Sequence, residues 1–208
     1  YFLIDCEVKN EVTDLESFVI QRIKKSKYLI YKPNDFTVDA FDMLIATQCG
    51  SIRNQNVFII GFGNIGAKIA LRLCERGADV FAYERNQKKL EQSIAGLNII
   101  KRSTSQIYPV SDIYSTEREI DILIGATPGI PIIDNKIVDR LKADGMIIDV
   151  GNGTLTTDAI AHAHERKIAI HSLSSLGGYV GMIENWIFHR NILARPAKKE
   201  YDGVVLII

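Results

Sequence analysis

The sequence has few cysteines, no excess of either charge and no long apolar run. Its three cysteines, Cys6, Cys49 and Cys74, are odd in number and far apart, which fits neither a disulfide framework nor a metal site. The 25 Lys and Arg residues balance 25 Asp and Glu residues without forming a basic stripe, so we expect no nucleic-acid partner. No apolar stretch is long enough to span a bilayer, and the first residues lack the basic region of a signal peptide. We therefore expect a cytoplasmic protein that does not bind a membrane.

The 208 residues suffice for one complete domain and a small appendage. Short apolar runs alternate with amphipathic segments, which predicts an α/β fold with a doubly wound parallel sheet. We divide the chain into an N-terminal βαβα segment at 1–50, a dinucleotide-binding Rossmann domain at 51–194 and a C-terminal tail at 195–208. Because the chain starts at Tyr1 rather than Met, we expect residues before it, and 1–50 would be the remnant of a substrate domain.

The same patterns place the individual elements. Strands are expected at 2–5, 28–31, 57–60, 80–83, 97–100, 120–124, 146–150 and 168–172. Helices are expected at 14–25, 38–48, 64–76, 86–96 and 179–193. The last residues, Val204–Ile208, are too apolar to lie in water, so we expect the tail to pack on the N-terminal segment or on another subunit of a homo-oligomer.

A glycine turn joins the strand at 57–60 to the helix that begins near Asn64. Gly61 permits the tight turn, Gly63 lets the backbone approach a pyrophosphate, and Gly66 lets the helix pack close to the sheet. The pyrophosphate would lie on the free amides of the helix N-terminus. The turn therefore predicts a cofactor site formed by Gly61, Phe62, Gly63, Asn64, Ile65 and Gly66.

An acidic residue follows the next strand at the position that a dinucleotide site requires. Glu84 would accept hydrogen bonds from the hydroxyls of the adenosine ribose, and its charge would repel a 2′-phosphate. This favours NAD over NADP as the cofactor. The neighbouring Arg85 weakens the preference, because its guanidinium could pair with a 2′-phosphate or stack on adenine.

Three further loops follow strands at the same predicted edge of the sheet. Ala126, Thr127 and Pro128 would run beside the nicotinamide ribose. Gly151 and Asn152 would meet the nicotinamide carboxamide. A turn at 174–178 would leave room for cofactor or substrate. Any one of these loops also fits an ordinary turn, but together on one rim they favour a binding site.

Parts of the sequence resemble the cofactor domains of two enzyme groups. The glycine turn, the segment Gly151-Asn-Gly-Thr-Leu-Thr-Thr-Asp158 and the helix entry at 176–180 look like glutamate/leucine-type amino-acid dehydrogenases. The helix at 39–46, with 124–129 and 148–151, looks more like adenosylhomocysteine hydrolase. The resemblance covers about three quarters of the chain, and it implies NAD binding through the glycines and Glu84, with Thr127 and Asn152 at the nicotinamide end. The lysine and aspartate that amino-acid dehydrogenases use have no counterpart in the first fifty residues.

Hydride transfer usually needs a group that moves a proton on the substrate. The candidates are His162, His164, His171, His189, Lys68 and Asp149. None has a convincing position, because the histidines fit a strand interior or helix surfaces, and Asp149 could simply fix its own loop. We assign no catalytic residue.

These observations predict an NAD-dependent oxidoreductase cofactor domain that acts on a small metabolite. Its acid or base would come from a preceding region, a partner chain or another subunit. Two alternatives stay open: a non-catalytic NAD(H) sensor or assembly module, and a hydrolase-type enzyme that holds NAD permanently.

Overall fold

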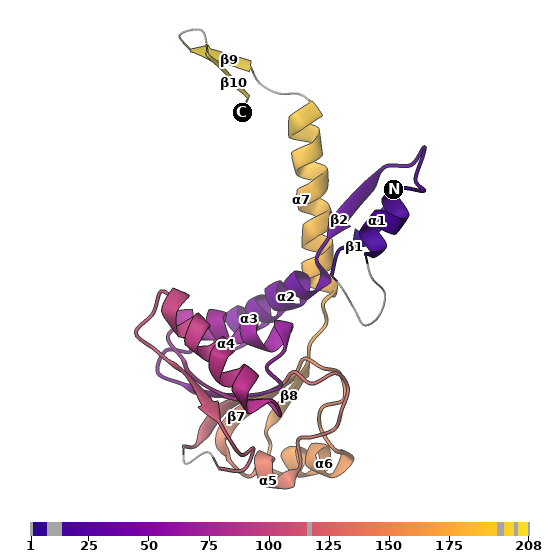
Figure 1. Ribbon diagram of the computed structural model, residues 1–208. Helices are drawn as coiled ribbons and strands as arrows, with labels where there is room; N and C mark the ends of the chain where they lie inside the picture. Colours follow the sequence, from indigo (N-terminus) through magenta and orange to yellow (C-terminus); the bar gives the residue numbers. More distant parts are fainter. Residues whose placement is uncertain (1, 8–13, 116–117, 195–197, 202–203, 208) are drawn as a thin grey trace.

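The computed structural model describes residues 2–7, 14–115, 118–194, 198–201 and 204–207 (Figure 1). Its strands are β1 (Phe2–Asp5), β2 (Tyr28–Tyr31), β3 (Asn56–Ile60), β4 (Asp79–Tyr83), β5 (Ile107–Val110), β6 (Ile120–Gly125), β7 (Leu141–Asp149), β8 (Ala169–Ser172), β9 (Lys198–Tyr201) and β10 (Val204–Ile207). Its helices are α1 (Leu15–Ile20), α2 (Pro33–Gln48), α3 (Asn64–Glu75), α4 (Gln87–Ile100), α5 (Asn135–Val138), α6 (Thr157–Glu165) and α7 (Leu176–Ala194).

Six parallel strands form the central sheet, in the order β5-β4-β3-β6-β7-β8. The strand order reverses at β3, which pairs with β4 on one side and with β6 on the other. This arrangement confirms the predicted doubly wound α/β fold. A parallel sheet is covered on both faces, which explains why its strands are continuous apolar runs rather than alternating ones.

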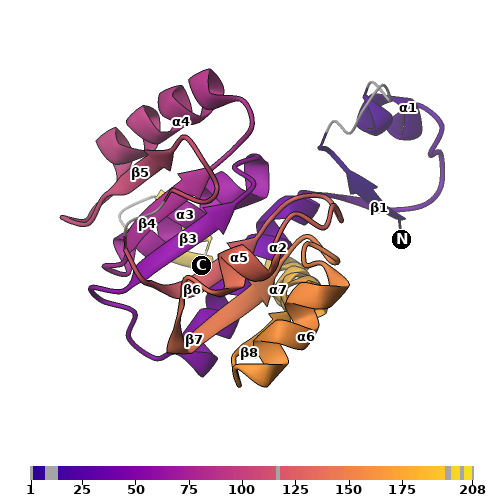
Figure 2. The same ribbon diagram turned by 90° about the horizontal axis from the view of Figure 1, so that it is seen from below.

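Helices cover both faces of this sheet (Figures 1 and 2). Val57 and Ile59 of β3 join one core cluster with residues of α2, α3 and α4. Phe58 and Ile60 join a second cluster with residues of α5 and α6. We call the sheet with α2 to α6 the Rossmann body. Its two clusters bury both faces of the sheet, so the loops at the strand ends remain accessible to ligands.

The predicted strand at 97–100 is wrong. These residues are the last turn of α4, which begins at the predicted N-cap Asn86 but continues through Gly96 to Ile100. The third strand of the sheet is instead β5, which contains Pro109. The side chain of Asn98 holds the backbone of Ile107 through two hydrogen bonds of 2.8 and 3.1 Å, which ties the end of α4 to β5. The expected helix at 14–25 is also shorter, because α1 ends at Ile20.

Helix α2 lies against α3 and is joined to it by a row of ion pairs. Asp35 pairs with Lys68, Asp39 with Arg72, and Asp42 with Arg76. We call these three pairs the ion-pair row. Both helices contribute residues three or four apart, which lie on one face of a helix. The row, together with the buried side chains of Phe41 and Ile45, fixes α2 on the Rossmann body.

The remaining elements lie beyond the Rossmann body (Figure 1). β1 and β2 form a separate two-stranded parallel sheet, which confirms the predicted order of the N-terminal βαβα segment. β9 and β10 pair with each other as an antiparallel hairpin past the end of α7. Arg195 and Ile208 lie outside the described residues. The division at residues 50 and 194, and the contact of the tail with another subunit, stay predictions. No helix in the described ranges combines the length and apolarity that crossing a bilayer requires.

Candidate cofactor crevice

Two hollows lie at the carboxyl edge of the central sheet, among the loops that follow β3, β4, β6 and β7. Their volumes are ≈ 180 Å³ and ≈ 360 Å³. Both are lined by Gly63, Ala126, Thr127 and Pro128, so they are direct neighbours, and we call the two together the crevice. The crevice spans the point at which the strand order reverses. Open α/β sheets bind their ligands at this place.

The first and last glycines of the turn are required by the fold. Gly61 has φ +99°, and a Cβ added to it would lie 2.7 Å from the carbonyl carbon of Ala126. A Cβ added to Gly66 would lie 2.1 Å from the carbonyl oxygen of Gly61. These contacts bring the start of α3 against the turn and against the loop after β6. The two glycines therefore shape the floor of the crevice.

The fold does not require the middle glycine. A Cβ added to Gly63 would meet no atom within 4 Å, and φ is not in the left-handed region. Gly63 is the N-cap of α3 and provides no side-chain cap to the first amides of that helix. The first amide N–H groups of a helix have no partner inside the helix, and they carry its positive end. An open space beside uncapped amides fits a pyrophosphate, as the sequence predicts.

Glu84 lies at the end of β4 on the opposite wall. Its Oε2 accepts a hydrogen bond from the backbone N–H of Phe62 at 3.1 Å, and its Oε1 accepts one from the N–H of Arg85 at 3.0 Å. Each carboxylate oxygen has two acceptor sites. One site on each oxygen therefore remains for ribose hydroxyls, while the glycine turn holds the carboxylate in place.

The loops after β6 and β7 form the other wall and are fixed to each other. A Cβ added to Gly151 would lie 1.7 Å from the carbonyl oxygen of Thr127, so the two backbones are in direct contact. The hydroxyl of Thr127 donates to the carbonyl of Ile130 at 3.1 Å. The hydroxyl therefore stabilises the loop to which Thr127 belongs.

Asp149 fixes the loop after β7 through hydrogen bonds to its side-chain carboxylate. It is 8% exposed, and its Oδ1 accepts from the hydroxyl of the fully buried Thr154 at 2.8 Å. Its Oδ2 accepts from the N–H of Gly153 at 2.7 Å. Thr154 in turn lies against Gly125, where an added Cβ would be 2.0 Å from the hydroxyl oxygen. The role of Asp149 is thus to hold the loop, one of the two possibilities that the sequence left open.

Most of the predicted cofactor residues meet around the crevice. The predicted residues that line the crevice are Gly61, Gly63, Asn64, Ile65, Gly66, Glu84, Arg85, Ala126, Thr127, Pro128 and Gly151. Phe62 does not, because its side chain is 3% exposed and belongs to the core. Asn152 does not line it either, and its side chain instead accepts from the hydroxyl of Ser172 at 3.3 Å. Whether any of these residues touches the cofactor stays a prediction.

Sequence reasoning missed the side walls of the crevice. Ile130 and Ile132 line it near Glu84, and Asn34 lines its other end from the first turn of α2. An isolated apolar residue in a loop does not by itself indicate a binding site, so Ile130 and Ile132 could not be predicted from the sequence. Asn34 is distant in sequence and reaches the crevice only because the ion-pair row fixes α2 beside α3.

No candidate for proton transfer lines the crevice among the described residues. Lys68 is paired with Asp35, and Nε2 of His162 lies 2.6 Å from a carboxylate oxygen of Asp139. His171 is half-buried in β8 beside Ile148. The crevice therefore has the parts of a cofactor site, while none of the proton-transfer candidates named from the sequence lines it.

The comparison with protein families agrees with this geometry. Residues 42–173 match the model of the NAD binding domain of D-isomer specific 2-hydroxyacid dehydrogenases. The chain belongs to this family. The match runs from α2 to the end of β8, so it contains all six strands of the central sheet and every loop of the crevice. The domain is therefore NAD-binding, which confirms the predicted cofactor.

Individual relatives are more distant. The chain is 30% identical over 125 residues to 2-ketogluconate reductase from Gluconobacter oxydans, a match that covers 57% of this chain and 36% of that protein. It is 27% identical over 148 residues to glutamate dehydrogenase A2 from Halobacterium salinarum, covering 65% of this chain and 35% of that one. The chain thus spans about a third of the length of these relatives.

A solved structure shares the fold over more of the chain. The A chain of dipicolinate synthase from Bacillus subtilis aligns with a TM-score of 0.57 and 19% identity, covering 93% of this chain and 63% of that one. At this identity the likeness concerns the fold alone. The match to the 2-hydroxyacid dehydrogenase family confirms an NAD-binding Rossmann domain, whereas the narrower resemblance to amino-acid dehydrogenases and adenosylhomocysteine hydrolase is not confirmed.

Proposed function

We propose that the chain is the cofactor-binding part of an NAD-dependent dehydrogenase that interconverts a small 2-hydroxy acid and the corresponding 2-oxo acid. The observation that carries the proposal is the crevice of a family member, in which an open glycine position, uncapped α3 amides and Glu84 face one space. The substrate class follows the family name and the similarity to a 2-ketogluconate reductase.

Each wall of the crevice has a separate task in this proposal. The α3 amides beside Gly63 hold the pyrophosphate, and Glu84 holds the adenosine ribose and disfavours a 2′-phosphate. The apolar Ile130 and Ile132 exclude water near the adenosine end. The rigid loops at Thr127 and Gly151 support the nicotinamide end. Bound NAD would supply the hydride acceptor, and the chain would fix its orientation.

The reaction also needs a proton acceptor for the substrate hydroxyl. Because no histidine or lysine of the described residues lines the crevice, we infer that this group comes from a preceding region, a partner chain or another subunit. The same observation favours one alternative function, an NAD(H)-binding sensor without catalysis. A sensor must bind NAD and NADH with different affinity, since a ligand shifts an equilibrium only through its differential affinity.

Two measurements on the same protein separate these functions. Titration calorimetry with NAD, NADH and NADP tests the cofactor site, and we expect NAD to bind more tightly than NADP. Oxidation of NADH, followed by its absorbance, is then measured with a panel of 2-oxo acids. Binding with turnover supports the dehydrogenase. Because the proton acceptor is proposed to lie outside the crevice, binding without turnover supports the sensor only if the full-length protein is assayed. Absence of binding to all three nucleotides contradicts both.

A further inference from the structure

The first turn of α2 is capped by a residue that is distant in the sequence. The N-cap of the helix is Lys32, whose side chain caps no amide, and Pro33 follows at the first helical position. The first N–H groups of a helix have no acceptor inside the helix, so a group from elsewhere can satisfy them. Here that group is Glu7, 27 positions before Asn34, whose Oε2 accepts from the N–H of Asn34 at 3.2 Å. The turn after β1 therefore caps the helix that borders the crevice.

The carboxylate of Glu7 is held in this place at an energetic cost. The N–H of Glu7 donates to Oδ1 of Asp5 at 2.8 Å, which fixes the turn after β1. Its Oε1 is buried and has no hydrogen-bond partner. A buried oxygen without a partner destabilises the folded chain, whereas Oε2 gains from the positive end of α2. The hydrogen bond to Asn34, together with the helix end, accounts for the position of this carboxylate.

Asn34 is the residue through which α2 reaches the crevice. It lines the larger hollow together with the glycine turn and the loops after β6 and β7. The residue is half-buried, and its side chain makes no hydrogen bond to another described residue. A carboxamide offers two donor hydrogens and one acceptor oxygen. Asn34 can therefore donate to a cofactor oxygen in this hollow.

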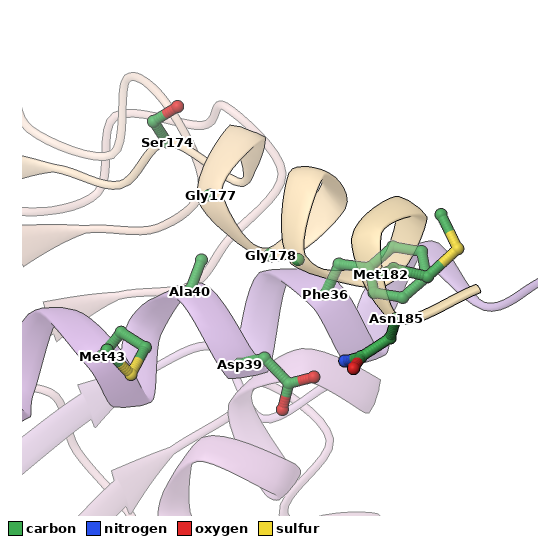
Figure 3. Close-up of a pocket in the computed structure, with 10 residues that line it drawn as sticks. Phe36, Asp39, Ala40, Met43, Ser174, Gly177, Gly178, Met182 and Asn185 are labelled. Atoms are coloured by element: carbon green, nitrogen blue, oxygen red, sulfur yellow. The ribbon is translucent and has the colours of Figure 1, made fainter. Parts of the chain in front are cut away.

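Two other contacts hold α2 just beyond Asn34. Asp35, the next residue, belongs to the ion-pair row with α3. Figure 3 shows Phe36 of α2 beside Gly178 of α7, where a Cβ added to the glycine would lie 2.4 Å from the carbonyl oxygen of Phe36. Of the hydrogen bonds among the described residues, the one that ties Asn34 to a group outside α2 comes from Glu7. Glu7 therefore completes the support of the first turn at the position that borders the crevice.

We propose that Glu7 is a positioning residue for the cofactor site, which holds Asn34 where its carboxamide contacts bound NAD. The proposal goes beyond the dehydrogenase function, since it concerns NAD binding and applies whatever reaction follows. The apparent affinity for NAD falls with the fraction of molecules in which Asn34 is in the binding position. A residue that acts only through Asn34 therefore cannot weaken NAD binding more than removal of the Asn34 side chain does.

A double-mutant cycle on NAD affinity, measured by calorimetry on the full-length protein, tests this dependence. Glu7→Ala removes the cap and should raise the NAD dissociation constant about 5-fold, the effect of a lost helix cap. Asn34→Ala should raise it at least as much. In the Asn34→Ala background, Glu7→Ala should have no further effect. Glu7→Gln keeps an acceptor oxygen for the N–H of Asn34, so the affinity should stay within about 2-fold of wild type.

A matched control is the cap of another helix near the N-terminus. Asp14 caps α1 by accepting from the N–H of Ser17 at 2.9 Å, and it does not line the crevice. Because Asp14 has φ +53°, Asp14→Gly removes the carboxylate without straining the backbone. NAD affinity should stay unchanged in this variant. Thermal melting without NAD would show that the Glu7 and Asn34 variants remain folded.

Hydrogen exchange followed by NMR gives a readout that a purely structural role would not produce. Coupling between two contacts is reciprocal, so bound NAD must strengthen the contact between Glu7 and α2. The N–H of Asn34 should therefore exchange more slowly when NAD is bound. In Glu7→Ala, this slowing by NAD should be lost. Slowing that is equal in the variant and the wild type would contradict the coupling.

Three results of the cycle would overturn the proposal. They are unchanged NAD affinity in Glu7→Ala, unchanged affinity in Asn34→Ala, and an equal loss from Glu7→Ala with and without the Asn34 side chain. The last result would show that Glu7 acts on the fold in general. All three leave the cofactor site itself intact. Absence of NAD binding by the wild type would instead overturn both this proposal and the proposed function.

Discussion

Two kinds of glycine occur in the chain, and the Rossmann body and α7 illustrate the difference between them. At positions 61, 66, 125 and 151 of the body, an added Cβ would overlap neighbouring atoms of the same chain. At Gly177 and Gly181 of α7, an added Cβ would meet none. Glycines of the first kind are explained by the fold alone. A glycine of the second kind is not explained by the fold, and at Gly63, which borders the crevice, we attribute it to the cofactor.

The largest effect should come from a glycine that the fold explains. Gly66→Ala would force a Cβ to within 2.1 Å of the Gly61 carbonyl oxygen, so the start of α3 must move. We expect a loss of roughly 3 kcal/mol in the free energy of unfolding, measured by denaturant titration. Gly96→Ala on the exposed face of α4, where an added Cβ meets nothing, is the matched control and should stabilise by about 1 kcal/mol. Equal stability of both variants would refute the distinction.

A glycine that borders the crevice should separate binding from folding. Gly63→Asp puts a carboxylate where we place the pyrophosphate, so NAD affinity should fall roughly 100-fold, as for an unpaired charge in a binding site. Melting without NAD should stay within a few degrees of the wild type, because the position is open. Calorimetry measures the NAD affinity, and thermal melting without NAD measures the stability of the variant. Unchanged NAD affinity would show that the glycine turn is not the cofactor site.

A smaller effect is expected at the opposite wall of the crevice. Glu84→Gln keeps the shape but removes the negative charge that holds the ribose hydroxyls. NAD affinity should fall about 10-fold, the value of a lost charge-assisted hydrogen bond, and the preference over NADP should narrow. Glu91→Gln on the exposed side of α4 is the control for a change of net charge. If NADP remains as strongly disfavoured as before, Glu84 does not set the preference.

The ion-pair row should give the smallest effect and a defined pH dependence. The two hydrogen bonds from Arg76, at 2.7 and 2.8 Å, lower the pKa of Asp42 below its ordinary value, although burial partly opposes them. The unfolded chain then binds more protons, so the pair stabilises above the unfolded pKa of about 3.9 and loses its effect as pH falls through the folded pKa. Asp42→Asn should cost about 1 kcal/mol at pH 7, because the pair is partly solvated. Urea titrations should show this cost shrinking as the pH falls below the unfolded pKa and disappearing below the lowered folded pKa. An equal cost at neutral and at acid pH would contradict the electrostatic explanation.

The sequence sufficed to predict strands and site residues where the local pattern agrees with the packing of the folded chain. Apolar runs and glycines placed β3, β4, β6 and the turn at 61–66, and the acidic residue after β4 placed one wall of the crevice. The third strand was misplaced because 97–100 is an apolar run with isoleucines, whereas β5 contains a proline that argues against a strand. The position of Asn34 in the crevice could not be read from the sequence. It depends on the packing of α2 against α3, which joins residues 33 to 34 positions apart.

The outer edge of β5, one of the two edges of the central sheet, is protected against pairing with a further strand. Asn98 occupies both the N–H and the carbonyl of Ile107, and Pro109, two residues on, has no N–H to donate. Gln87 donates to the carbonyl of Val110 at 3.2 Å. A free strand edge is a template on which further strands can add and aggregate. With the N–H and carbonyl of Ile107 occupied and no N–H at Pro109, this edge is a poor template for a further strand, so the proline that hid the strand from sequence reasoning also protects the edge of the sheet.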